Sequence, residues 1–299
     1  MDRIIKPILY DSKSCFNALK MLCDKFDFLN MKIIGKSVNN QPITCVKIGN
    51  ARENVLFCGA MHGNESITAT LLLLFIEDIC DSLDKCKQLC GINMRAALKS
   101  RSLIFVPMTN PDGCNIAQKG EIACGKKVDF IKDICKGEFT KWKANLNGVD
   151  INHNFDADWS KMRLIEIENG IFGPACGKYG GPYPESEPET IALTTLCRLS
   201  KPEHIISLHT QGEVIYYGYG KISCKENRMA EILSMTSGYS LEDPDFLSGS
   251  AGFKDWFCKE FLKPGFTIEC GIGKNPLHQN LIAPIYNRLL ETFAIASII

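Results

Sequence analysis

The chain has 299 residues, of which 45% are apolar and 23% are charged, as in ordinary globular proteins. Lysine plus arginine equals aspartate plus glutamate at 34 each, so no net field draws the chain to nucleic acid, and a nucleic-acid partner is disfavoured. The longest apolar run, Leu71 to Ile76, is too short to span a bilayer, which argues against an integral membrane segment.

Apolar periodicity predicts helices and strands in alternation along the chain. In order, the predicted elements are a helix at 11–28, strands at 43–48 and 54–58, a helix at 66–80, strands at 103–107, 205–208 and 266–268, and a helix at 284–298. This alternation indicates an α/β fold in which a layered sheet carries helices on both faces. Because no internal repeat or linker is visible, residues 1–299 are predicted to form a single domain. Ligands of such sheets gather beyond the carboxyl ends of the strands, where the polar clusters of this sequence fall.

The fifteen cysteines bear on the compartment of the protein. Their number is odd, no C-x-x-C pair occurs, and residues 1–14 lack the apolar run of a signal peptide, so we expect free thiols and a cytoplasmic location. Cys114, Cys124 and Cys135 lie in a polar stretch and are a minor candidate for a second metal site, because their spacing of about ten residues fits no compact zinc knuckle.

A histidine and a glutamate, His62 and Glu65, follow the strand at 54–58 on the turn into the next helix. Imidazole nitrogen and carboxylate oxygen both suit zinc. Taken alone, the pair is more simply explained as a turn whose glutamate is favoured by the helix dipole. Of the five histidines in the chain, His204 and His278 are expected at the surface.

Two more predicted strands run into residues of the same kind. His209 follows the strand at 205–208 and would complete a set of two histidines and one glutamate, which recurs in catalytic zinc sites with an open water position. Glu269 follows the strand at 266–268, where it could take a proton from an attacking water and pass it to a leaving amine. Glu269 alone is more simply an edge-strand residue. The three strand ends together favour a catalytic zinc site.

Seven segments of the chain resemble, in order, those of the zinc metallocarboxypeptidases. They are Gly35-Lys36-Ser37, His62-Gly63-Asn64-Glu65, Asn110-Pro111-Asp112-Gly113, Gly148-Val149-Asp150-Ile151-Asn152, Ser186-Glu187-Pro188-Glu189, Ser207-Leu208-His209 and Phe266-Thr267-Ile268-Glu269. The resemblance implies a mixed sheet of about eight strands sandwiched between helices, with one catalytic zinc ion per chain. It places His62, Glu65 and His209 on the metal, with Glu269 as the general base.

The chain departs from this family where members carry arginines. The arginine that clamps the terminal carboxylate of the substrate is replaced in the pair Asn152-His153, and the arginine between the first two ligands is replaced by Asn64. Lys143 stands where an arginine usually polarises the scissile carbonyl. A lysine can stabilise an oxyanion but cannot form a bidentate clamp. Ordinary C-terminal trimming is therefore disfavoured.

Four segments are similar to those of bacterial γ-D-glutamyl-meso-diaminopimelate peptidases. They are Trp142-Lys143-Ala144-Asn145, His209-Thr210-Gln211-Gly212-Glu213, Gly252-Phe253-Lys254-Asp255-Trp256-Phe257 and Gly271-Ile272-Gly273-Lys274-Asn275-Pro276-Leu277. The resemblance implies cleavage between D-glutamate and diaminopimelate in peptidoglycan-derived peptides, with Lys143 as a second catalytic residue. Asn64, Asn152, His153 and Gln211 are the predicted substrate-binding residues.

Four points remain open from the sequence. The tyrosine that caps the site in the family has no clear match, although Phe246 and Leu247 fall near its place. The activity could instead be that of a zinc carboxypeptidase acting on ordinary L-peptides. A third alternative is a catalytically inactive peptide-binding relative, which the retention of Glu269 argues against because a binder needs no general base. The oligomeric state is not indicated.

Overall fold

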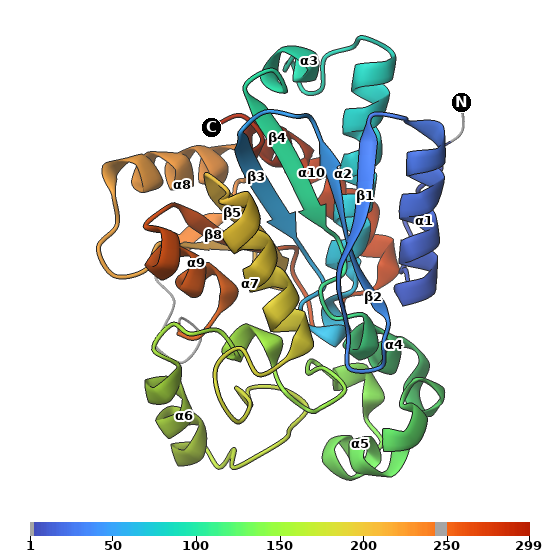
Figure 1. Cartoon of the computed structure of the whole chain (residues 1–299), viewed down its shortest axis with the longest axis vertical. Coiled ribbons are helices and arrows are strands. Elements are labelled where there is room, and N and C mark those ends of the chain that lie inside the picture. The colour runs from blue at the N-terminus through green and yellow to red at the C-terminus, as the bar shows by residue number, and fades with distance from the viewer. Residues whose placement is uncertain (1–2, 243–249) are drawn as a thin grey trace.

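The computed structural model describes residues 3–242 and 250–299 (Figure 1). Phe246 and Leu247, which fall near the expected place of the capping tyrosine, lie outside the described residues.

Within the described residues, eight strands form one mixed sheet in the order β1-β2-β4-β3-β5-β8-β6-β7. The strands are β1 (Leu29–Lys36), β2 (Pro42–Ile48), β3 (Glu53–Cys58), β4 (Arg101–Val106), β5 (His204–His209), β6 (Val214–Tyr217), β7 (Ser240–Glu242) and β8 (Gly265–Glu269). The four central strands, β4, β3, β5 and β8, run parallel, whereas β2 and β6 flank them in antiparallel orientation. The expectation of a mixed sheet of about eight strands is confirmed.

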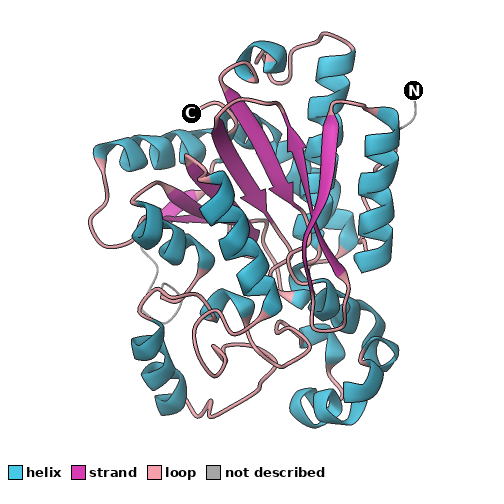
Figure 2. Cartoon of the chain, in the orientation of Figure 1, coloured by secondary structure: helices cyan, strands magenta, loops and turns pink. Residues whose placement is uncertain are grey.

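Helices cover both faces of this sheet (Figure 2). They are α1 (Ser12–Lys25), α2 (Ile67–Asp84), α3 (Met94–Ala97), α4 (Pro111–Lys119), α5 (Val128–Cys135), α6 (Trp159–Glu168), α7 (Pro188–Ser200), α8 (Cys224–Ser237), α9 (Phe253–Phe261) and α10 (Ile282–Ala296). α1, α2, α8 and α10 share an apolar core with one face, and α7 and α9 share another with the opposite face. Among the helices described, none combines the length and apolarity that crossing a membrane requires.

The two cores follow from the alternation of side chains along each strand. In β3, Val55 and Phe57 belong to the core under α2 and α10, whereas Leu56 and Cys58 belong to the core under α7 and α9. All four are fully buried, because a parallel sheet between helices has no face left for water. Phe57 packs on Phe75 of α2 with ring centroids 5.7 Å apart, and burying such a ring contributes roughly 1.5–3 kcal/mol.

The first helix begins where the sequence indicates. Asp11 is the N-cap of α1, and its carboxylate accepts a hydrogen bond from the amide of Ser14 at 2.6 Å. The Ser14 hydroxyl in turn accepts from the amide of Asp11 at 2.9 Å, which completes a capping box.

The expectation for His204 is wrong, whereas His278 is exposed as predicted. His204 is the first residue of β5 and is fully buried. Its Nε2 donates to the carbonyl oxygen of Ala296 in α10 at 2.7 Å, so the histidine ties the end of that helix to the sheet.

The second metal site considered for Cys114, Cys124 and Cys135 does not form. All three are buried, but Cys114 lies in the core beneath α2, and the other two lie in a separate apolar cluster around Trp142. Burial raises the pKa of Cys124 to about 11, which disfavours the thiolate that a metal requires. These residues act as small apolar side chains.

Candidate metal centre and active site

Four chemically reactive side chains meet at one edge of the sheet because they follow parallel strands. His62 is the N-cap and Glu65 the last residue of the short 3-10 helix η1 (Gly63–Glu65) that comes after β3. His209 is the last residue of β5 and Glu269 the last of β8, and the two lie opposite each other in the strand register. In Figure 1 the arrows of β3 and β4 point toward the end of the molecule where α4, α5 and α6 lie.

A close backbone contact holds the turn that carries His62. A side chain at Gly63 would collide with the carbonyl of Gly113 and lie 2.7 Å from that of Trp142, so only glycine fits there. The amide of Gly63 donates to the carbonyl of Lys143 at 2.9 Å. The loop bearing Lys143 is therefore docked directly onto the turn bearing His62.

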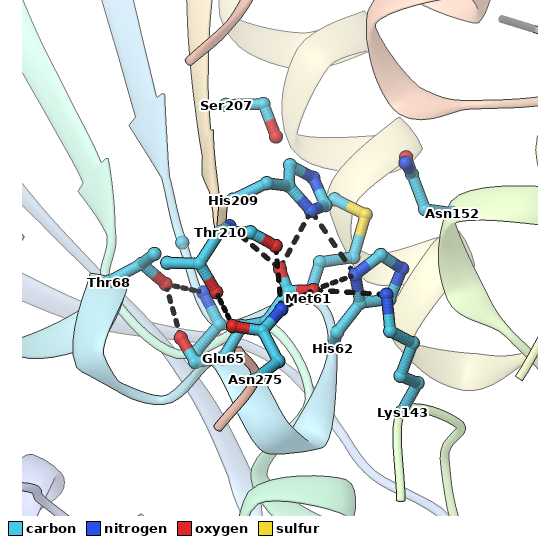
Figure 3. A network of polar contacts seen from close by, with 12 residues as sticks. Met61, His62, Glu65, Thr68, Lys143, Asn152, Ser207, His209, Thr210 and Asn275 are labelled. Atoms are coloured by element: carbon cyan, nitrogen blue, oxygen red, sulfur yellow. Dashed lines mark hydrogen bonds and ion pairs between the residues drawn. The ribbon is translucent and has the colours of Figure 1, made fainter. Parts of the chain in front are cut away.

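His62, Glu65 and His209 point toward one another (Figure 3). The Nδ1 atoms of the two histidines lie 3.0 and 3.1 Å from the two carboxylate oxygens of Glu65 and 3.3 Å from each other. Zinc ligands at about 2.0–2.1 Å in tetrahedral geometry lie roughly 3.3–3.4 Å apart. The donor set and its spacing therefore fit a zinc ion. It is the only such cluster of His, Cys, Asp and Glu in the described parts of the chain that could hold a metal.

Further polar groups hold His62 and Glu65 in position. His62 Nε2 lies 3.1 Å from Oδ1 of Asp150, which leaves Nδ1 to face the metal position. The Thr210 amide donates to one Glu65 oxygen at 3.2 Å, and the Asn275 side chain donates to the other at 3.3 Å. Asp150, Thr210 and Asn275 are not among the site residues predicted from the sequence. Each nevertheless lies in a segment that carries the family resemblance, and that is the signal by which they could have been found.

The charged groups of His62, Glu65, Asp150 and Lys143 shift one another's pKa values. Burial acts to lower the pKa of His62, but the carboxylates of Glu65 and Asp150 outweigh it and raise that pKa to about 10. Burial acts to raise the pKa of Glu65, but the charges of His62 and Lys143 outweigh it and lower that pKa well below its usual range. Burial also lowers the pKa of His209. Neutral imidazole and ionised carboxylate are the forms that bind metal, so metal binding releases protons at this site.

Glu269 and Lys143 bring a carboxyl group and an ammonium group to the same place. Burial, with added repulsion from Glu65, raises the pKa of the Glu269 carboxyl. A carboxyl with a raised pKa is suited to exchange protons near neutral pH. The attraction of Glu65, 3.3 Å from the Lys143 Nζ, raises the pKa of Lys143, so this group stays an ammonium ion.

Glu269 and Lys143 line a cavity of about 310 Å³, which is at the small end of the range for ligand pockets. Of the predicted substrate-binding residues, Asn152 and Gln211 also line it. Asn64 does not: it is buried, and its Oδ1 has no hydrogen-bond partner among the described residues.

His153 lies away from this cavity. Its Nδ1 is 3.2 Å from Oε1 of Glu166, and both residues line a separate small hollow beside α6. The preceding residue, Asn152, faces α9 instead, where its Oδ1 accepts from the amide of Phe253 at 3.0 Å. Consecutive residues of one turn thus point to different neighbours.

Comparison with known proteins identifies the chain. A family model described as zinc carboxypeptidase matches residues 18–291. The chain belongs to the zinc carboxypeptidase family. It is therefore a metallopeptidase of a zinc-dependent family, and the donor set of His62, Glu65 and His209 agrees with that metal.

Two curated relatives cover most of this family member. It is 35% identical over 289 residues to gamma-D-glutamyl-L-diamino acid endopeptidase 1 of Lysinibacillus sphaericus, which is 95% of this chain and 71% of the relative. It is 33% identical over 284 residues to the uncharacterized protein YqgT of Bacillus subtilis, covering 93% of this chain and 74% of that protein.

Solved structures of the same fold are more distant in sequence. Thrombin activatable fibrinolysis inhibitor superposes with a TM-score of 0.76 at 18% identity, over 99% of this chain and 76% of that one. Murein-tripeptide amidase MpaA from Escherichia coli O157 gives a TM-score of 0.54 at 20% identity, over 90% of this chain and 92% of that one. At these identities the likeness establishes the fold.

Proposed function

We propose that the protein hydrolyses the bond between the γ-carboxyl of D-glutamate and meso-diaminopimelate in peptidoglycan stem peptides or muropeptides. One zinc ion per chain would be held by His62, Glu65 and His209. The observation that carries the proposal is the set of ionisable side chains that line the cavity. Glu269 lines it together with the ammonium groups of Lys143 and Lys254, and no arginine is among its described lining residues. The relative from Lysinibacillus sphaericus, named for a γ-D-glutamyl-L-diamino acid bond, supports it.

The absence of arginine argues against ordinary carboxypeptidase activity. A planar guanidinium binds a free terminal carboxylate with two parallel hydrogen bonds, which neither asparagine nor histidine reproduces. At the two positions concerned, Asn64 is buried outside the cavity and His153 is engaged with Glu166. A substrate held mainly by its C-terminal carboxylate would gain little here.

The side chains of the site divide the chemistry between them. A bound zinc ion supplies a Lewis acid that polarises the scissile carbonyl and makes water more acidic. Glu269 takes a proton from the attacking water and delivers it to the departing amine of the diamino acid. The Lys143 ammonium stabilises the negative charge that develops on the carbonyl oxygen. Asn152 and Gln211 offer amide groups that orient the substrate from the cavity wall.

We further propose that residues 1–299 form a single peptidase domain that acts in the cytoplasm on soluble muropeptides. All eight strands in the described parts of the chain belong to one sheet, which supports a single domain. The fifteen cysteines are unpaired thiols, and ten of them are buried, which suits a reducing compartment.

The test is product analysis with a defined peptide. We expect the purified protein to release meso-diaminopimelate from L-Ala-γ-D-Glu-meso-diaminopimelate, as identified by mass spectrometry. A blocked L-dipeptide substrate of carboxypeptidases should be at least roughly 100-fold poorer in kcat/KM. Efficient trimming of L-peptides without cleavage of the γ-linked bond would assign the activity to an ordinary carboxypeptidase instead.

The matched control is Glu269→Gln, which keeps the shape of the side chain but cannot accept a proton. We expect it to retain zinc and the fold while losing about 10²–10⁴-fold in kcat on the γ-linked peptide. Turnover near the wild-type level would give Glu269 another role and leave a mechanism without it.

A further inference from the structure

The cavity wall contains a buried ion pair that the proposed mechanism does not use. Lys254 and Asp255, in the first turn of α9, line the same cavity as Lys143 and Glu269. Their side chains are only 5% and 3% exposed, and the Lys254 Nζ contacts Oδ1 of Asp255. Removing two charges from water costs several kcal/mol that their attraction often fails to recover, so such a pair is a poor explanation for stability. Its place beside the substrate cavity favours a role in binding.

The Lys254 ammonium has bonding capacity left for a ligand. It carries three N–H donors. Among the described residues, one meets Asp255 and one meets the carbonyl oxygen of Gly218 at 2.6 Å, which leaves the third for the cavity that Lys254 lines. Gly265 in β8 makes room for the lysine, because a side chain there would lie 3.2 Å from the Cγ atom of Lys254.

Two side-chain oxygen atoms of the cavity wall lie close to Gly252, the residue before the first turn of α9. A methyl group added to Gly252 would lie 2.9 Å from Oδ2 of Asp255 and 3.3 Å from Oδ1 of Asn152. The two acceptor oxygens therefore lie close to each other on either side of this glycine, and a larger residue at position 252 would crowd them. All three residues line the cavity.

An ordinary structural role explains part of this arrangement. Gly252 is the N-cap of α9, and the Asp255 carboxylate accepts a hydrogen bond from the Gly252 backbone amide. That bond accounts for an acidic or amide side chain at this position. It does not account for a buried lysine next to it, since lysine gains nothing at the first turn of a helix. Lys254 is therefore the residue that requires a functional explanation.

We propose that Lys254, Asp255 and Asn152 together bind a zwitterionic substrate group, with ammonium and carboxylate on one carbon atom, and thereby select diaminopimelate. The inference rests on the proposed function and deepens it. The Lys254 ammonium pairs with the distal carboxylate of diaminopimelate, while the oxygens of Asp255 and Asn152 accept from its distal ammonium. A lysine side chain brings an ammonium to the same place without the carboxylate. The ammonium of that lysine is repelled by the Lys254 ammonium, with no substrate carboxylate to offset the repulsion, so the site rejects it.

The experiment compares two peptides that differ only at the diamino acid, L-Ala-γ-D-Glu-meso-diaminopimelate and L-Ala-γ-D-Glu-L-Lys. The readout is the ratio of their kcat/KM values within one preparation, which partial misfolding of a variant does not change. We expect the wild type to prefer diaminopimelate by about 30-fold or more. Lys254→Met should lower that ratio by at least about 10-fold, because the partner of the distal carboxylate is gone.

Two control variants separate this role from general damage to α9. Lys259→Met removes a half-exposed ammonium from the same helix and should leave the ratio unchanged. Lys254→Met combined with Asp255→Asn removes both charges, so no unpaired buried carboxylate remains. It should bind the two peptides with little preference.

The outcomes distinguish this inference from the proposed function. If γ-linked peptides are cleaved but Lys254→Met keeps the wild-type ratio, the inference is overturned and the proposed function stands. If the zinc-loaded wild type cleaves neither peptide, the proposed function fails, and calorimetry with free meso-diaminopimelate and L-lysine decides the inference. Weaker binding of meso-diaminopimelate by Lys254→Met than by the wild type would uphold it, and equal binding would overturn it.

Discussion

At the scale of single residues, Lys143 has the most testable role. In the proposed mechanism its ammonium stabilises the charge that develops as the carbonyl is attacked. Lys143→Ala should therefore lower kcat by about 10²–10³-fold and change KM much less. Steady-state kinetics on the γ-linked peptide measures both constants. Lys141→Ala removes an exposed lysine two residues earlier in the chain and should change neither constant. A change in KM alone would make Lys143 an anchor for a substrate carboxylate.

His204 makes stability depend on pH. Burial lowers its pKa to about 4, and its Nδ1 has no partner among the described residues. The unfolded chain takes up this proton near pH 6.5, so the folded state keeps the full contribution above that pH and loses about 2–3 kcal/mol as the pH falls toward 4. His204→Gln lacks the proton site. Urea unfolding from pH 7 to pH 4 should show the wild type losing more stability than the variant, and parallel curves would contradict this.

At the scale of elements, the sequence predicts the central strands better than the edge strands. The segment at 54–58 is apolar throughout because β3 is buried on both faces, and its boundaries are correct to one residue. β7, at the edge, has only three residues, none of them buried. Short exposed strands carry no apolar pattern of their own, and their pairing with a neighbour creates them.

The same contrast holds for the candidate site. His62, Glu65, His209 and Glu269 could be placed together because each follows a strand, and parallel strands end at one edge. Lys254 comes from a helix, and nothing in its spacing shows that it lines the cavity. The sequence pattern also does not show which way a side chain in a loop points.

The close packing of the turn after β3 predicts that adding one methyl group, at Gly63, destabilises the protein. Gly63→Ala would push a side chain into the carbonyls of Gly113 and Trp142, so the turn must move. We expect a loss of at least about 2 kcal/mol in the free energy of unfolding, together with weaker zinc binding. Denaturant titration and metal analysis measure the two effects. Gly173→Ala is the control, because nothing lies within 4 Å of its added methyl group.

At the scale of the whole molecule, the metal should stabilise the fold. A ligand that binds only the folded state adds RT ln(1 + [L]/Kd), about 4 kcal/mol at a thousandfold excess over Kd. We expect one zinc ion per chain and a lower Tm after chelation. His62→Ala or His209→Ala should lose the metal and unfold at the same temperature with or without chelator. Full zinc occupancy in either variant would refute the ligand assignment.

The order of the strands also governs when a metal centre can exist. β5, which carries His209, pairs with β3 only after some 147 further residues have followed His62 along the chain. Pairings of such large sequence separation form slowly. During synthesis, at about 5–20 residues per second, a nascent chain presents His62 and Glu65 for at least several seconds before the third ligand emerges. Zinc therefore joins late, and a loaded site marks a chain whose central sheet is already assembled.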